Sequence, residues 1–154
     1  MKKESSKKIF QRTAADLGFS GSNTTFLIKH GDKFLTVNFQ NASGNRSFYI
    51  NGGISYTELL SQTELEQIQT SPCNSQPYWP PVHVDFRAEN IPGTPITQAS
   101  IDEATSEHDI DKIETIIRTA IESMIIFTCN HGSREEVRRL KQARLFSAII
   151  NKEV

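Results

Sequence analysis

The chain has 154 residues, of which 36% are hydrophobic and 23% are charged, and its 17 Lys and Arg residues face 18 Asp and Glu residues. This composition excludes an intrinsically disordered chain, and the presence of only two cysteines excludes a small scaffold held together by disulfides. The formal net charge of -1 removes the global electrostatic case for a nucleic-acid or membrane-surface binder. We expect a single domain over residues 1–154 that buries a core of its own.

Neither a signal peptide nor a transmembrane helix is expected. The basic residues at the N-terminus are followed by only two apolar residues before Arg12. The longest mostly apolar stretch, residues 110–127, carries five charged side chains, which excludes a position across a bilayer. Cys73 and Cys129 lie 56 positions apart and have no neighbouring metal-binding pattern. These observations favour a cytoplasmic protein with two reduced thiols and no membrane association.

The first predicted element is an amphipathic helix over residues 6–17. Apolar side chains recur there at helical spacing, and Ser5 and Ser6 are suited to cap the first turn. Gly18 follows as a natural left-handed end of the helix. Phe19 is then placed to fold back onto the last turn.

Residues 24–40 predict a β-hairpin, because two alternating segments flank Gly31-Asp32, a two-residue connection suited to a type II′ turn. A second hairpin, turning through residues 41–46, would pair Val37 with Ile50. Both turns direct the same side chains inward, and these would form one apolar face: Phe26, Ile28, Leu35, Val37, Phe39, Phe48 and Ile50. The opposite face would carry a largely polar set: Thr25, Leu27, Lys29, Phe34, Thr36, Asn38, Gln40, Tyr49 and Asn51.

The middle of the chain gives weaker signals. Residues 56–69 favour a helix, and residues 71–81 favour an irregular loop rich in proline. Residues 82–87 alternate between apolar and polar side chains, which predicts a fourth strand with one buried face. Prolines and a glycine within residues 90–99 predict a loop or short linker.

Two helices are predicted in the last third of the chain. An apolar stripe from Ile110 to Ile125 indicates the first, with Ser106 as its expected cap. Ser133 and Glu136 form a capping box for the last helix. The apolar side of that helix would be lined by Val137, Leu140, Leu145, Ala148 and Ile149. The expected fold class is α+β: an antiparallel sheet of four or more strands, an N-terminal helix and a C-terminal helical hairpin on the apolar face.

Residues that could carry chemistry are few. His83, Asp85 and Arg87 share one face of the predicted fourth strand, which would suit an acid–base cluster. We favour a solvated strand face, because catalytic groups normally come from several elements around a cleft. The Gly52-Gly53 pair favours a bulge or close backbone packing over phosphate binding, and Cys129 favours a small core residue over a nucleophile. No nucleotide-binding loop or metalloprotease motif occurs, so we expect no metal and no cofactor, and an enzyme is not supported.

Charge is unevenly distributed in the C-terminal half. Acidic residues dominate positions 102–114, and basic residues crowd the last helix. One interpretation is helix stabilisation, by acids at a helix start and by bases along a solvated face. The other is that the acidic stretch contacts a basic partner, and the basic helix an acidic partner or nucleic acid. The candidate binding residues of the acidic stretch are Asp102, Glu103, Glu107, Asp109 and Asp111.

Several segments resemble the signature of an uncharacterised bacterial family defined by a domain of unknown function: Leu17-Gly18-Phe19, Val37-Asn38-Phe39-Gln40, Phe48-Tyr49-Ile50-Asn51 and Gly53-Ile54. The resemblance covers roughly the first 60 residues. It implies an α+β domain with an antiparallel sheet, and it carries no established active site. Small proteins of this kind resemble, by analogy, immunity proteins that bind and neutralise a toxin. The matching polar positions are Asn38, Gln40, Tyr49 and Asn51.

The function we expect is non-enzymatic binding by a cytoplasmic interaction protein of the immunity or inhibitor type. Its partner would be a protein, such as a toxin with a basic surface, contacted through the acidic stretch or the polar sheet face. The alternative is a small-ligand or nucleotide-binding domain with a pocket around the polar sheet residues. A hydrolase that uses His83, Asp85 and Arg87 ranks third. Neither a membrane nor nucleic acid is expected as a partner.

Overall fold

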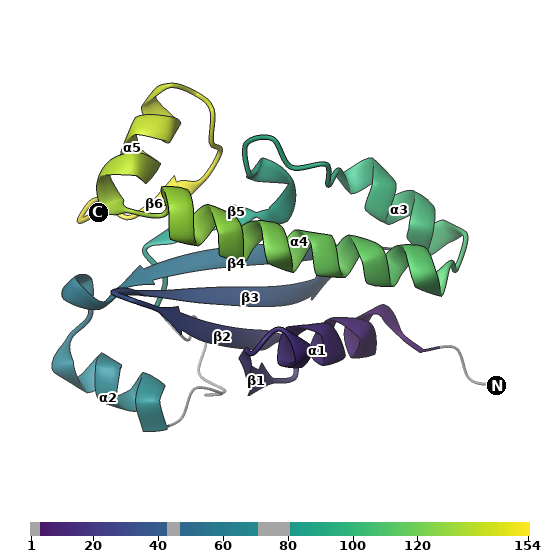
Figure 1. Cartoon of the computed structure of the whole chain (residues 1–154), viewed down its shortest axis with the longest axis horizontal. Coiled ribbons are helices and arrows are strands. Elements are labelled where there is room, and N and C mark those ends of the chain that lie inside the picture. Colours follow the sequence, from purple (N-terminus) through teal and green to yellow (C-terminus); the bar gives the residue numbers. More distant parts are fainter. Residues whose placement is uncertain (1–3, 43–46, 71–80) are drawn as a thin grey trace.

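The computed structural model describes residues 4–42, 47–70 and 81–154, and their arrangement confirms the predicted α+β fold class (Figure 1). The strands are β1 (Ser20–Ser22), β2 (Thr25–His30), β3 (Lys33–Asn41), β4 (Phe48–Tyr56), β5 (Val84–Arg87) and β6 (Ile149–Ile150). The helices are α1 (Ser6–Asp16), α2 (Gln62–Thr70), α3 (Gln98–Ser106), α4 (Ile110–His131) and α5 (Arg134–Gln142), with short 3-10 helices η2 (Thr57–Leu59) and η3 (Ala88–Asn90). All strand pairs are antiparallel, and the sheet order β1-β2-β3-β4-β5-β6 follows the chain.

The first helix and the first hairpin form as predicted. Ser5 caps α1, and Gly18 adopts a φ of +94° directly after it, a conformation that costs glycine little. In the hairpin β2–β3, Phe26 pairs with Val37. Gly31 has a φ of +59°, as the first position of a type II′ turn requires.

The second hairpin, β3–β4, differs from the predicted register by two residues. Val37 pairs with Gly52 rather than with Ile50, and Gln40 pairs with Tyr49. The alternation of apolar residues determines only which face a side chain takes, and it leaves shifts of two residues open. Such a shift keeps every side chain on its predicted face, so the predicted apolar face is retained.

The inner face of the sheet packs against α1 and α4. Phe10 of α1 lies over the sheet, with its ring centre 5.8 Å from that of Phe26 and 5.7 Å from that of Phe39. The residues that α4 buries in the same core recur at helical spacing: Ile113, Ile117, Ala120, Ile121, Met124 and Phe127. Among the described residues, no helix has the length and apolar character needed to cross a bilayer.

The outer face of the sheet is divided into two parts. At one end, Leu27 and Phe34 are buried with Leu60 and Ile68 beneath α2, in a second apolar cluster that the sequence pattern did not predict. At the other end, the outward side chains are polar. Helix α2 corresponds to the helix predicted over 56–69. It starts later than predicted, because β4 continues to Tyr56 and η2 follows that strand. The loop predicted over 71–81 lies, apart from its last residue, outside the described residues.

The loop predicted over residues 90–99 is present over residues 91–97, and a helix that the sequence did not predict follows it. Residues 98–106 form a separate helix, α3, because Thr97 caps it by accepting a hydrogen bond from the backbone N–H of Ser100 (3.1 Å). Only Ile101 and Ala104 of α3 are buried, so its apolar stripe is too short to identify from the sequence.

The N-terminus of α4 also differs from the prediction. The helix is capped by Asp109, whose carboxylate accepts a hydrogen bond from the backbone N–H of Lys112 (3.1 Å), and not by Ser106. His108 has a φ of +52°, which turns the chain sharply between α3 and α4. Ser106 therefore belongs to the preceding helix.

The last helix is shorter than predicted. Ser133 caps α5 as expected, but the helix ends at Gln142. Leu145 and Ile149, expected on its apolar side, have exposed fractions of 57% and 75%. Ile149 belongs instead to β6, which pairs with β5, a contact between distant segments that local periodicity does not reveal. Figure 1 shows α5 beyond the C-terminal end of α4 rather than alongside it.

The inward orientation of β3 can be tested at Val37, which is fully buried. Val37→Asp places an unpaired carboxylate in the core, which costs several kcal/mol and is comparable with the whole stability of such a domain, about 5–15 kcal/mol. We expect this variant to unfold or to lose most of its stability in thermal denaturation followed by circular dichroism. Lys29→Asp, at an exposed position on the outer face of β2, is the control and should change stability by about 1 kcal/mol or less. Equal losses in both variants would refute the assigned faces.

Candidate functional site

The polar sheet end consists of the outward side chains at the end of the sheet that α2 does not cover: Asn38, Gln40, Tyr49, Asn51 and Arg87. The amide of Asn51 donates hydrogen bonds to Oδ1 of Asn38 (3.1 Å) and to Oε1 of Gln40 (2.9 Å). The amide of Asn38 donates in turn to Oγ1 of Thr25 (3.0 Å). This chain of hydrogen bonds crosses β2, β3 and β4 and holds the amides in one orientation.

An arginine lies over an aromatic ring at the same end. The guanidinium carbon of Arg87 is 3.9 Å from the centre of the Tyr49 ring, a cation–π contact. Arg87 pairs with Asn51 across β5 and β4, so Tyr49 is its diagonal neighbour on the same face. Both side chains are half-buried. The polar sheet end therefore presents a fixed Arg–Tyr pair beside the bonded amides.

The acidic surface comprises the five predicted acids: Asp102, Glu103, Glu107, Asp109 and Asp111. Three of them have partners within the chain. Asp102 accepts a hydrogen bond from the amide of Gln98 (2.9 Å), Glu107 forms an ion pair with Lys112 (3.0 Å), and Asp109 caps α4. Hydrogen bonds to the carboxylate of Asp102, from Ser47 and then Gln98, hold its pKa below the usual value. Of these three residues, only Asp109 stands at a helix start, as the helix-stabilising interpretation requires; Asp102 lies within α3 and Glu107 caps its C-terminal end.

The other two acids face a cleft between α3 and α4. Glu103 and Asp111 are exposed and line a volume of about 430 Å³, together with Lys112 and Ile116. Their carboxylates are available to a basic group that approaches this end of the molecule.

A direct contact joins the acidic surface to the polar sheet end. The hydroxyl of Ser47 donates a hydrogen bond to Asp102, and the amide of Gln98 donates to the backbone carbonyl of Phe48 (3.2 Å). Ser47 immediately precedes β4, and Tyr49 follows two residues later. The structure therefore brings the two predicted sets of binding residues to the same end of the molecule.

His83, Asp85 and Arg87 do not form a common cluster. His83 is only 7% exposed, and its Nδ1 accepts a hydrogen bond from the backbone N–H of Tyr56 (3.0 Å), so the predicted solvated position is wrong for this residue. Burial lowers the pKa of His83. Asp85 is exposed, and desolvation raises its pKa in spite of the nearby Arg87, which itself stacks on Tyr49.

Two further predictions can be compared with the structure. A Cβ on Gly52 would lie 2.7 Å from the ring of Phe86, and one on Gly53 would lie 2.5 Å from a methyl group of Val82, which confirms close packing over β4. Cys129 is exposed, so its prediction as a core residue is wrong: it falls off the buried stripe of α4. The described residues contain no group of three potential metal ligands.

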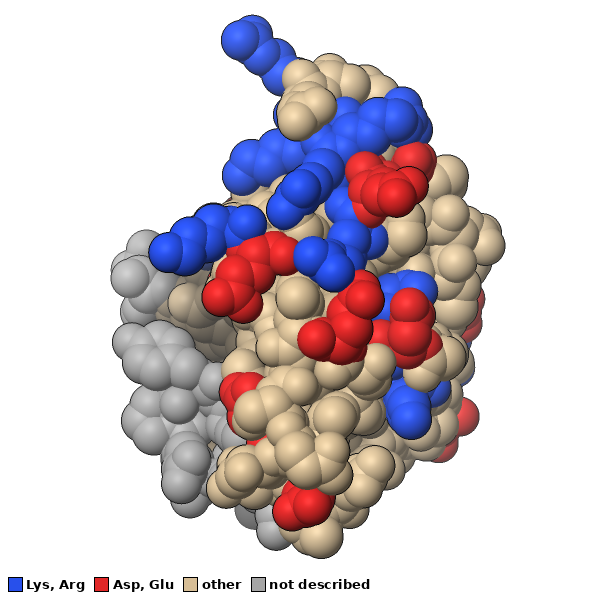
Figure 2. All heavy atoms as spheres, turned by 90° about the vertical axis from the view of Figure 1, so that its left-hand side faces the viewer, with Lys and Arg blue, Asp and Glu red and all other residues tan. Residues whose placement is uncertain are grey.

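Basic side chains gather at the opposite end of the molecule. Figure 2 shows Lys and Arg side chains clustered over α5. The basic surface consists of four cations of α5 and two that follow the helix: Arg134, Arg138, Arg139 and Lys141, with Arg144 and Lys152. Arg134, Arg138 and Lys141 follow one another at spacings of four and three residues, which places them on one side of the helix.

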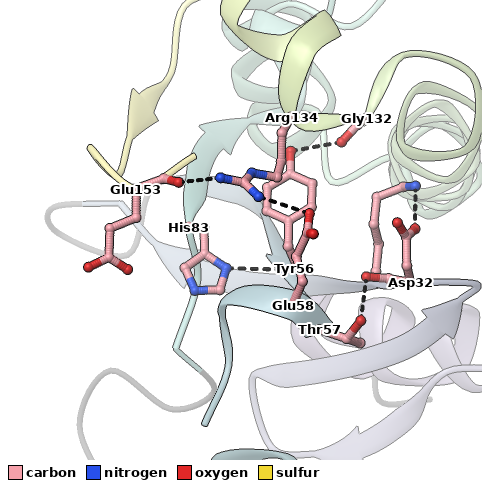
Figure 3. A network of polar contacts seen from close by, with 9 residues as sticks. Asp32, Tyr56, Thr57, Glu58, His83, Gly132, Arg134 and Glu153 are labelled. Atoms are coloured by element: carbon pink, nitrogen blue, oxygen red, sulfur yellow. Dashed lines mark hydrogen bonds and ion pairs between the residues drawn. The ribbon is translucent and has the colours of Figure 1, made fainter.

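A polar network lies beneath the start of α5 (Figure 3). The buried phenol of Tyr56 donates to the carbonyl of Gly132 (2.7 Å), and burial raises its pKa. Arg134 pairs with Glu58 (3.0 Å) and donates to the carbonyl of Glu153 (2.6 Å). The network thus ties α5 and the last residues of the chain to the end of β4. Next to it lies a cleft of about 480 Å³, bordered by Tyr56, Glu58, Arg134 and Arg138 among others.

Sequence reasoning found the amides of the polar sheet end but missed two features. Arg87 was assigned to a possible acid–base cluster, because its contact with Tyr49 depends on the pairing of β4 with β5, which the sequence did not predict. Ser47 was predicted only as the strand residue that follows the second turn and pairs with Gln40, although its hydroxyl contacts Asp102, 55 residues later. Neither contact has a local sequence signal.

Comparison with known proteins identifies a family. The model of a family described as "Domain of unknown function (DUF4304)" matches residues 10–127, and the chain belongs to this family. The polar sheet end and the acidic surface lie within the matched residues, whereas the basic surface lies after them. Neither the search of curated proteins nor the search of solved structures found a match.

The buried His83 should make stability depend on pH. Its pKa is lowered in the folded protein, so the unfolded chain binds the proton more readily, and the stabilisation is complete only above about pH 6.5. We expect the free energy of unfolding, measured with urea, to fall as the pH drops below about 6.5. His83→Asn should flatten this dependence, because the Oδ1 of asparagine can still accept the hydrogen bond from Tyr56 while it does not titrate.

The matched control is His108→Asn. His108 is exposed at a φ of +52°, a conformation that asparagine tolerates, so this variant should keep the pH dependence of the wild type. If His83→Asn and the wild type lose stability in parallel on acidification, another group is responsible.

Proposed function

We propose that the protein binds a protein partner, without catalysis, through the polar sheet end and the adjoining acidic surface. The observation that carries the proposal is their junction: the hydrogen bond from Ser47 to Asp102 joins a fixed Arg–Tyr pair and bonded amides to a group of acids. Residues predicted separately as two candidate surfaces therefore lie at the same end of the molecule, where one partner could contact both.

The physical chemistry of this end suits protein recognition. Tyrosine and arginine dominate the binding energy of many protein interfaces. The contact between Arg87 and Tyr49 and the hydrogen bonds of Asn51 already restrict these side chains, so a partner has less conformational entropy to remove. Exposed carboxylates such as Glu103 add long-range attraction for a positively charged partner.

The kind of partner follows from this charge. We propose a toxin with a basic surface, which the protein would cover in the cytoplasm as an immunity or inhibitor protein. The size of the chain and the resemblance to small bacterial proteins support this class by analogy only. The alternative of a small-ligand or nucleotide site gains no specific support, because the amides of Asn38, Gln40 and Asn51 are engaged with one another.

The experiment expresses each protein encoded next to the gene for this chain and takes one that stops cell growth as the toxin; if none does so, the proposed class of partner is wrong. Co-expression should restore growth of cells that produce the toxin, and the two purified proteins should form a complex. Tyr49→Ala with Arg87→Ala should weaken that complex by about 2 kcal/mol or more, because both removed side chains are of the type that dominates interfaces. Isothermal titration calorimetry measures the loss, and circular dichroism checks that the variant is folded. A folded variant that binds and protects like the wild type would exclude the polar sheet end.

A charge reversal tests the acidic surface separately. Glu103→Lys with Asp111→Lys should slow association and reduce its dependence on salt, since both residues are exposed, whereas Asp102 and Glu107, which have structural contacts, are left intact. Glu66→Lys with Glu122→Lys makes the same change of net charge at exposed positions elsewhere. Equal association rates for these two variants would show that only net charge matters.

A further inference from the structure

The basic surface on α5 is a second charged region, separate from the proposed binding end. Figure 1 places α5 and α3 at opposite ends of α4. Helix α4 has 22 residues and is therefore about 33 Å long, several times the Debye length of roughly 8 Å at physiological salt. The two charged regions therefore act independently on an approaching molecule.

Some cations of the basic surface already have hydrogen-bond or ion-pair partners within the chain. Arg139 binds the carboxylate of Glu136 with two hydrogen bonds (2.6 and 2.9 Å), which lower the pKa of that carboxyl to about 2. Arg134 pairs with Glu58 and is held in the network of Figure 3. Lys141 donates to the carbonyl of Ala148. These three cations contribute to the fold as well as to the charge.

The remaining cations have no such role. Within the described part of the chain, the side chains of Arg138, Arg144 and Lys152 make no ion pair with an acidic group, and all three residues are exposed. Arg138 also borders the cleft of about 480 Å³ beside Tyr56. The lining of that cleft carries the carboxylates of Asp32, Glu58 and Glu135 beside two arginines, so the unpaired positive charge belongs to the exposed surface around α5 and not to the cleft.

We propose that the basic surface, through its exposed and unpaired cations beside this cleft, is a docking site for an acidic polypeptide segment. An acidic peptide supplies carboxylates at intervals, which can reach Arg138 and Lys152 while avoiding Glu135, an exposed acid that also borders the cleft. A nucleic acid presents an unbroken row of phosphates, which such an interspersed carboxylate repels. Leu145, 57% exposed just after α5, offers an apolar contact that a peptide side chain can cover. The proposal is independent of the function proposed for the opposite end.

The test uses a fluorescently labelled synthetic peptide in which glutamate alternates with leucine. Fluorescence anisotropy with the full chain should show saturable binding that weakens by about tenfold when NaCl is raised from about 50 to 300 mM. Arg138→Glu with Lys152→Glu should weaken binding by about tenfold or more at the lower salt. Lys7→Glu with Lys8→Glu, on α1, is the control for net charge and should bind like the wild type. Circular dichroism establishes that both variants are folded.

Other outcomes overturn the proposal. These are an absence of saturable binding, or an equal loss of affinity in the two double variants. Tighter binding of an oligouridine RNA, or of vesicles of phosphatidylserine and phosphatidylcholine, would assign the surface to nucleic acid or membrane instead. Salt-sensitive self-association in light scattering, abolished by Arg138→Glu with Lys152→Glu, would make a second copy of the chain the occupant.

Discussion

The burial of one face of the strand meander beneath α1 and α4 is the constraint on which the rest of the structure depends. Because successive strand residues point to opposite faces, each apolar residue directed toward α4 sends its neighbour outward. Val37 and Phe39 face the core, and Asn38 and Gln40 therefore reach the outer face. The polar sheet end is thus positioned by the packing of the opposite face, and a loss of that packing would remove the site together with the fold.

This alternation of side chains between the two faces explains how much of the fold and of the candidate site could be predicted from the sequence. The apolar alternation of β2, β3 and β4 predicted both faces and the amides of the candidate site, although the β3–β4 register was two residues off. Contacts between distant segments had no such signal. Helix α3 buries only two side chains, β6 has only two residues, and the contact of Arg87 with Tyr49 requires the pairing of β4 with β5. His83 is a further example. The strand periodicity predicted that its side chain is exposed to solvent, whereas the side chain is buried and accepts a hydrogen bond from the backbone of Tyr56.

Charge is organised along α4. Acids from α3 and from the first turn of α4 gather at one end, and the cations of α5 gather at the other (Figure 2). At each end, some charged groups have structural partners, such as Asp102 with Ser47 and Arg134 with Glu58, while others remain free for a partner. The net charge of -1 thus conceals two regions of opposite sign.

The two edges of the sheet limit how this protein can meet another. Within the described residues the edge strands are short, with three residues in β1 and two in β6, so each is itself a short template for a strand from a second molecule. Many proteins recognise a partner by adding its strand to the edge of their sheet, and the same process drives aggregation. The short edge strands of this protein offer few residues for such an addition. Recognition must then rely on side chains at the faces and ends of the molecule. These can change by substitution without alteration of the backbone, so the scaffold can acquire new partners while its sheet stays the same.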